Sequence, residues 1–123
     1  MRKVVLNFLS ALEGYHSTFK MLHWSATHHS EHVLTDDIDD SILDYEDKIS
    51  EVAMGALDTK FGIGELKCML PQSKEIKGVL KELKNDVEEF RETAENNGFI
   101  GLVNILDDFI SDINKWNYLR TFV

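Results

Sequence analysis

Apolar residues recur every three or four positions in four stretches of this chain, and this spacing constrains the fold more than any other feature. One face of an α-helix repeats with that period, so each stretch predicts one amphipathic helix. The chain has one proline and seven glycines, too few for the frequent turns of a many-stranded β fold. The four apolar stripes are Val5, Leu9, Leu12, Phe19 and Leu22; Leu34, Ile38, Ile42, Tyr45, Ile49, Val52 and Ala56; Ile76, Leu80, Leu83, Val87 and Phe90; and Leu102, Leu106, Phe109, Ile113 and Trp116.

Cap and turn residues set the expected boundaries of these helices. The helices are expected to run from about Lys3 to about Trp24, from the N-cap Ser30 to near Leu57, from just after Ser73 to Asn96-Asn97-Gly98, and over the last stripe. Residues 58–72 form the one long connection. Its fifteen residues, at about 3.3 Å each, can span the roughly 37 Å of a helix of about 25 residues. We therefore predict an all-α, ferritin-like four-helix bundle with one crossover, between its second and third helices.

Length and composition restrict the setting of this fold. The chain has 123 residues, the size of one domain with one core, so we expect residues 1–123 to form a single ferritin-like domain. Its only cysteine, Cys68, excludes an internal disulfide and a zinc site built from several thiolates. No apolar run approaches the length of about 18 residues that a membrane span needs. Asn7 interrupts the apolar start of the chain, so no signal peptide is expected, and the cytoplasm is the expected compartment.

The charge is negative and unevenly distributed. With 13 basic and 22 acidic residues the net charge is −9, and residues 31–51 contain nine acids against one base, which gives −8. This balance opposes a sequence-independent contact with nucleic-acid phosphates. Only Arg2 and Lys3 precede the first helix. These two residues do not make a lysine-rich arm, so direct DNA binding is not expected. A solvated helix face is the ordinary explanation of an acidic run.

All the histidines lie beside or within this acidic run. They are His16, His23, His28, His29 and His32. Imidazole and carboxylate groups brought together in a helical hairpin can ligate iron, zinc or manganese. At about 100° per residue, one side of the second helix, opposite its core stripe, carries His32, Asp36, Asp47 and Glu51. His32/Asp36 and Asp47/Glu51 are i, i+4 pairs, so the members of each pair can share an ion, whereas His16 is expected to pack or hydrogen-bond.

The same side of the second helix also carries Leu43 and Met54, which indicates a second buried face between two subunits. Asp36 and Asp47 are separated by about 16 Å along one helix, too far apart to bind one ion. An antiparallel copy, related by a two-fold axis near positions 41 and 42, brings Asp36 opposite the partner's Asp47 and His32 opposite the partner's Glu51. The sequence therefore predicts a two-fold dimer with two equivalent metal sites. The alternative is a solvated acidic face with two incidental apolar residues.

The order of these residues resembles the Dps proteins (DNA-binding proteins from starved cells), the cage-forming branch of the ferritin-like superfamily. The strings that carry the resemblance are His23-Trp24, His32-x-x-x-Asp36 and Asp47-x-x-x-Glu51. The resemblance implies that Trp24 lies beside a ferroxidase centre whose ligands are His23, His32, Asp36, Asp47 and Glu51. It implies that Fe²⁺ is bound, oxidised by peroxide or oxygen and sequestered, with zinc or manganese as other metals for the same site. A larger hollow cage is also implied.

The chain departs from the family pattern in several places. The stretch between His23 and His32 is shorter than the family's and lacks its Gly and Phe, so His28 or His29 is an alternative ligand. The whole chain is short for the family, and it has no lysine-rich tail. The resemblance therefore implies iron binding, ferroxidase-type oxidation and storage without direct DNA binding.

Three other functional interpretations are considered. An ordinary ferritin holds its metals inside each bundle with Glu and Glu-x-x-His, but no histidine follows position 32, which disfavours that site. An all-α nucleotide pyrophosphatase would hold Mg²⁺ with helical carboxylates; those available are Asp36, Asp40, Asp47 and Glu51. That enzyme would leave the histidines unexplained. The third reading is a helical interaction module that binds no metal.

Overall fold

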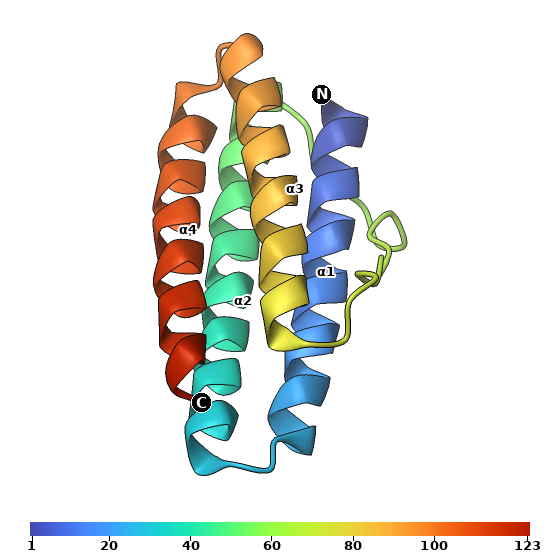
Figure 1. Cartoon of the computed structure of the whole chain (residues 1–123). Helices are drawn as coiled ribbons and strands as arrows, with labels where there is room; N and C mark the ends of the chain where they lie inside the picture. The colour runs from blue at the N-terminus through green and yellow to red at the C-terminus, as the bar shows by residue number, and fades with distance from the viewer.

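The computed structural model describes residues 1–123 and contains four α-helices and no β-strand. The helices are α1 (Arg2–Ser25), α2 (His29–Leu57), α3 (Ile76–Asn96) and α4 (Ile100–Leu119), followed by a short 3₁₀-helix, η1 (Arg120–Phe122). Helix α1 packs on α2 and α3, and α4 packs on the same two helices, so the four form a bundle (Figure 1). The prediction of an all-α chain with four helices is confirmed. None of the helices has both the length and the apolar composition needed to cross a membrane.

Residues 58–75 connect α2 to α3 and run beside α1 (Figure 1). Near the start of this connection, Arg2 donates to both carboxylate oxygens of Glu65 at 2.7 Å. Farther along, the main-chain N–H of Met69 donates to the carbonyl of Ser10 at 3.0 Å. These bonds attach the connection to two successive parts of α1.

Gly14 allows the connection to lie directly on α1. A Cβ atom at this position would be 1.7 Å from the main-chain oxygen of Met69, far inside any allowed contact. Only glycine, which has no Cβ, permits this approach. Glycine normally destabilises a helix. Its presence at position 14 is explained by the backbone of the connection, which lies against α1 at this point.

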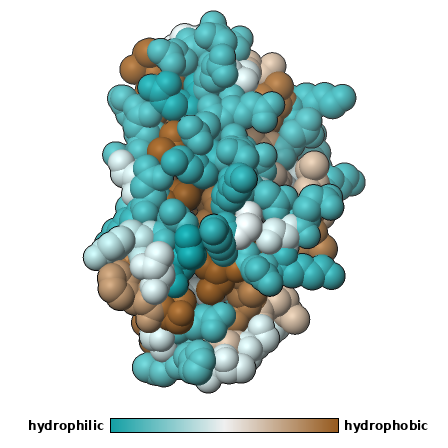
Figure 2. Space-filling model, viewed as in Figure 1, coloured by the Kyte–Doolittle hydropathy of each residue, from teal (hydrophilic) through white to brown (hydrophobic).

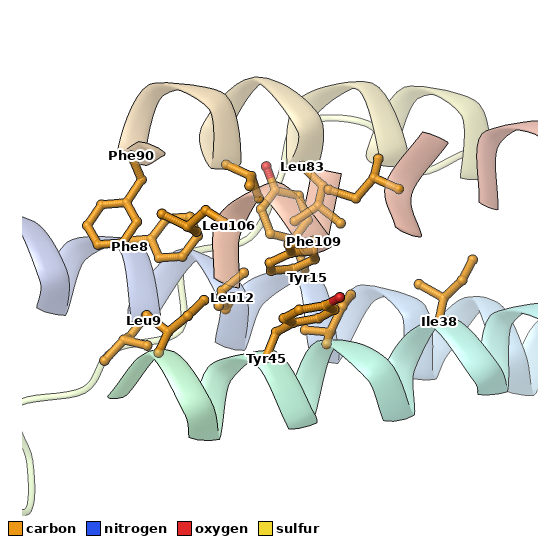
Figure 3. Close-up of a cluster of buried hydrophobic side chains, with 14 of the residues drawn as sticks. Phe8, Leu9, Leu12, Tyr15, Ile38, Tyr45, Leu83, Phe90, Leu106 and Phe109 are labelled. Atoms are coloured by element: carbon orange, nitrogen blue, oxygen red, sulfur yellow. The ribbon is translucent and has the colours of Figure 1, made fainter. Parts of the chain in front are cut away.

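The helices pack around 24 buried apolar residues, which form one core. Two stacked aromatic pairs join helices across it, Phe8 with Phe90 and Tyr45 with Phe109, each with ring centroids 4.2 Å apart (Figure 3). The first pair links α1 to α3 and the second links α2 to α4. Burying each large side chain contributes about 1.5–3 kcal/mol, and aromatic geometry adds to that.

Two tyrosine hydroxyls add polar links between the same helices. Tyr15 donates to Asp86 and Tyr45 donates to Asp112, both at 2.5 Å. Burial, together with the facing carboxylate, raises the pKa of both phenols. Each hydroxyl therefore stays protonated and remains the donor. Asp112 on α4 is half-buried and accepts the bond from Tyr45.

The structure corrects three details of the expected helices. In α2 the inward residue after Ile49 is Ala53, which is fully buried, whereas the expected core residues Val52 and Ala56 are exposed. The step of four residues keeps the stripe facing the bundle, while Val52 and Ala56 lie to one side of it. Helix α2 also begins at His29 with His28 as N-cap, so the prediction of Ser30 as N-cap is wrong. Helix α3 begins at Ile76, later than the position just after Ser73 that was expected.

Candidate metal site

His23 and His32 face each other where α1 reverses into α2. Only residues 26–28 separate the two helices. The two imidazole rings stack with centroids 3.8 Å apart and an interplanar angle of 20°. The short reversal therefore brings together two of the predicted ligands from two different helices.

The two histidines are held by reciprocal hydrogen bonds. Nδ1–H of His23 donates to the main-chain carbonyl of His32 at 2.6 Å, and Nδ1–H of His32 donates to the carbonyl of His23 at 3.0 Å. A carbonyl oxygen only accepts, so each Nδ1 carries a proton, and Nε2 is the ring nitrogen that can offer a lone pair to a metal. Metal-binding histidines are commonly oriented in this way by a bond from their other nitrogen.

Asp36 on α2 lies next to His23. Its Oδ1 atom lies 3.9 Å from Nε2 of His23. The Asp36 side chain is 55% exposed and that of His23 only 19%, and His32 is also exposed, so solvent reaches Asp36 and His32 more readily than His23. His32 is one helical turn before Asp36 on α2. His23, His32 and Asp36 thus lie near one another at one end of α2, although within the single chain they are not arranged to hold a metal ion together.

The other two predicted ligands, Asp47 and Glu51, lie farther along α2 and are exposed. Asp47 is separated from Asp36 by about 16 Å along the helix. No group of three or more His, Cys, Asp or Glu residues within the single chain is arranged to hold a metal ion. Glu51 lines an open depression together with Met54, Lys60 and Phe61. One chain therefore presents the predicted ligands as two separate sets.

His28 and His29, the alternative ligands, lie at the start of α2. His28 is its exposed N-cap, and His29 is its first residue. The His29 ring is 6.4 Å from the His32 ring, centroid to centroid, and tilted by 31°. His29 therefore remains near the histidine pair without stacking on it.

Large apolar side chains are exposed close to the predicted ligands. Trp24, which follows His23 in α1, is 63% exposed, and its ring is 5.0 Å from Nζ of Lys20. Leu43, on α2 between the two sets of acids, is 40% exposed. Tryptophan is enriched at protein interfaces, whereas a single exposed leucine is common on any protein surface.

Asp39, a buried acid between the same two helices, was not among the residues predicted from the sequence. Nδ1 of His16 donates to its Oδ1 at 2.5 Å, so the expected hydrogen-bonded role of His16 is confirmed. Burial raises the pKa of Asp39, and the bond from His16 opposes this only in part. Asp39 follows Ile38 and is three residues before Ile42, so its place within the apolar stripe was a signal of burial.

Glu46 is a second partly buried acid on α2, next to Asp47. Its Oε2 atom is enclosed and has no hydrogen-bond partner. Burial, and then the neighbouring carboxyl of Glu13 on α1, raise the pKa of Glu46 to about 8. The protonated form of Glu46 is therefore favoured, which reduces the negative charge beside Asp47.

Comparison with known protein families, curated proteins and solved structures finds no match for this chain. The functional conclusion therefore rests on the residues themselves and on how the fold arranges them.

Proposed function

We propose that this protein binds Fe²⁺ and oxidises it at a site shared by two chains, as Dps-like members of the ferritin-like superfamily do. The observation that carries the proposal is the orientation of His23 and His32. Both rings keep Nε2 free as a lone-pair donor, and one of these nitrogens lies 3.9 Å from a carboxylate oxygen of Asp36. Two neutral imidazoles and a carboxylate suit a first-row divalent metal such as Fe²⁺.

A second copy of the chain would complete the ligand set. In an antiparallel pair with a two-fold axis near positions 41 and 42, Asp36 lies opposite the partner's Asp47 and His32 lies opposite the partner's Glu51. The separation of about 16 Å between the two ends of this face on α2 favours such a pair over closure within one chain. A self-complementary interface of this kind contains two equivalent sites.

The exposed apolar residues support association through the same face. Trp24 and Leu43 are 63% and 40% exposed in the single chain, and burying them against a copy would favour a dimer. The depression lined by Glu51 and Met54 offers a concave surface at the end of α2 opposite the histidines. The apo dimer would be weakened by repulsion among the carboxylates, and metal binding would strengthen it by linkage.

The proposal includes a ferritin-like topology and assembly. The long connection, residues 58–75, runs beside α1, as the crossover of a ferritin-like bundle would. Dimers of this kind could associate further into a hollow cage that retains the ferric product.

In this proposal Fe²⁺ is the substrate and the residues perform three tasks. The histidines bind the ferrous ion through neutral nitrogen. The carboxylates of Asp36, and of the partner's Asp47 and Glu51, favour the ferric ion because its higher charge is attracted more strongly to negative oxygen. Coordination positions that no residue fills give access to peroxide or oxygen, which accepts the electron.

The test is ferrous oxidation, followed as the absorbance of ferric product after Fe²⁺ is added in air or with peroxide. Asp36→Asn and Glu51→Gln should each remove most of the acceleration over protein-free solution. Asp44→Asn, an exposed acid on the same helix, is the matched control and should keep it. Equal rates in all four proteins would contradict the proposal.

Two other outcomes would favour the alternative functions. Release of pyrophosphate from a nucleoside triphosphate, dependent on Mg²⁺ and without ferric absorbance, would indicate the nucleotide enzyme. No activity in either assay would leave a helical interaction module. Direct DNA binding is not part of the proposal, because a net charge of −9 opposes it.

A further inference from the structure

A groove between α3 and α4 collects positive charge in a chain that is otherwise acidic. It lies at the end of the bundle where α3 begins and α4 ends, and no acidic residue lines it. Its polar lining consists of Lys77, Lys81 and Lys84 on α3, Asn114 and Asn117 on α4, and Arg120 in η1. The net charge of the whole chain is −9, so this concentration of cations is a local exception.

The four cations of this groove are Lys77, Lys81, Lys84 and Arg120. None of them belongs to an ion pair in the chain. Arg91, farther along α3, shows the contrast, because it pairs with both Glu95 and Asp107. Glu88 stands four residues after Lys84, a spacing that permits pairing, yet no ion pair forms.

The three lysines are spaced along one face of α3. Lys77, Lys81 and Lys84 are related as i, i+4 and i+7, so their ammonium groups are neighbours. Like charges at this spacing destabilise a helix. The row extends over about 10 Å of the helix, and an anion lying along it would remove the repulsion.

Arg120 and the two asparagines face this row from the other side of the groove. Nε of Arg120 donates to Oδ1 of Asn117 at 3.0 Å, which orients the guanidinium and leaves its terminal N–H groups for a ligand. Guanidinium and amide N–H groups are good donors to phosphate oxygens. Lys77 lies in the first turn of α3, where the helix dipole also attracts negative charge.

We propose that this groove binds a short linear polyphosphate, either an inorganic chain or the triphosphate of a nucleotide. Several negative charges in a row match cations spread over about 10 Å, whereas one compact phosphate would contact only part of the row. The floor is rigid, because Leu80 and Ile113 beneath it are each 1% exposed and belong to the core. In Figure 2 hydrophilic atoms cover most of the upper part of this face, and apolar patches lie toward the end where α3 begins.

The acidic surroundings favour a short ligand over a long one. Residues 31–51 on α2 carry a charge of −8, and α2 packs on α4. Lys77 and Arg120 also line a neighbouring depression together with Glu31 and Glu75, so acidic side chains lie at one edge of the groove. A nucleic-acid strand would extend beyond the groove and meet acidic surface.

The experiment is calorimetric titration of the whole chain with inorganic tripolyphosphate. The buffer contains a chelator that removes divalent metals, and the salt concentration is about 0.15 M. We expect saturable binding of one tripolyphosphate per chain. The double variant Lys81→Gln/Lys84→Gln should weaken binding at least about tenfold, because it removes two charge-assisted bonds. Lys115→Gln, an exposed lysine on α4 outside the groove, should bind as the wild type does.

Parallel titrations identify the source of the phosphate chain. ATP binding as tightly as tripolyphosphate, or more tightly, would support a nucleotide, and tripolyphosphate binding alone would support an inorganic chain. The proposal is overturned if tripolyphosphate does not saturate, or if Lys115→Gln loses as much affinity as the double variant. Tighter binding of a single-stranded oligonucleotide than of tripolyphosphate would also overturn it. The substituted lysines, Lys81, Lys84 and Lys115, are all at the surface. An unchanged or higher melting temperature of the double variant therefore checks that it is folded.

Discussion

His23 and His32 each donate a ring N–H to the main-chain carbonyl of the other, at 2.6 and 3.0 Å. This exchange closes the reversal between α1 and α2. It uses Nδ1 of both rings, so the opposite nitrogen of each ring stays free for a metal ion. The structural and the proposed chemical roles of these histidines therefore belong to different atoms and can be separated by substitution.

The first prediction separates those roles at His32. An asparagine can place its amide N–H near the position of Nδ1–H but has no counterpart of Nε2. His32→Asn should therefore keep the free energy of unfolding near the wild-type value and lose ferrous oxidation. His32→Ala should lose oxidation and also about 0.5–1.5 kcal/mol, the value of one hydrogen bond. Urea unfolding measures the difference, and equal destabilisation by both changes would show that the bond to His23 does not hold the reversal.

The second prediction concerns the hydroxyl of Tyr45, which donates to Asp112 at 2.5 Å while its ring stacks on Phe109. Tyr45→Phe keeps the stack and removes only the bond. It should lower the free energy of unfolding by about 1–2 kcal/mol, measured in urea. Tyr118→Phe is the control, since Tyr118 is 62% exposed and should change stability little. If both variants unfold at the same urea concentration, the link to Asp112 contributes nothing.

The third prediction tests how the long connection lies on α1. Gly14→Ala should destabilise the fold by more than about 1 kcal/mol, because the new Cβ would be 1.7 Å from the main-chain oxygen of Met69. Gly55→Ala in α2 has open space around the added atom. It should raise stability by about 0.5–1 kcal/mol through helix propensity. Thermal unfolding of both variants gives the sign, and a stabilised Gly14→Ala would contradict this position of the connection.

The fourth prediction concerns acid stability and Glu65. Its hydrogen bond with Arg2, and then the N–H of Gly62, lower the pKa of Glu65 to about 2 from its ordinary value of 4.5. Because the folded-state pKa is the lower one, the stabilisation is present above about pH 4.5 and is lost as the pH falls towards 2. The melting temperatures of Glu65→Gln and of the wild type should therefore converge over that range. High salt should reduce the difference above pH 4.5, since the pair is exposed to solvent.

The existence of all four helices followed from the spacing of apolar residues, because each helix buries one face in a common core. The spacing of apolar residues predicts burial less well near helix ends and at small residues. Ala53 is as apolar as Ala56, and only the contact of α2 with its neighbours decides which of them is buried. The cap of α2 likewise depends on how tightly the chain reverses after α1, which spacing alone does not express.

The candidate site was predictable in part. Helical arithmetic placed His32 beside Asp36, and the resemblance added His23; the structure stacks His23 of α1 on His32 and brings it within 3.9 Å of Asp36. The buried bond of His16 to Asp39 was not predicted as a pair, because it depends on which residues of two helices face each other. The meeting of Asp36 with Asp47 depends on a second chain and stays a prediction.

The most direct test of the shared site is subunit mixing with Asp36→Ala and Glu51→Ala. Each homodimer should lose ferrous oxidation, because each substitution removes a ligand from both sites. In a mixed dimer both substitutions fall in one site and leave the other intact. After exchange in equal amounts, with folding checked by circular dichroism and exchange checked by mass spectrometry, oxidation should return to about a quarter of the wild-type rate, since half of the dimers are mixed and have one of two sites. No recovery from folded and exchanged subunits would mean that two chains do not share the ligands, and the account would be wrong.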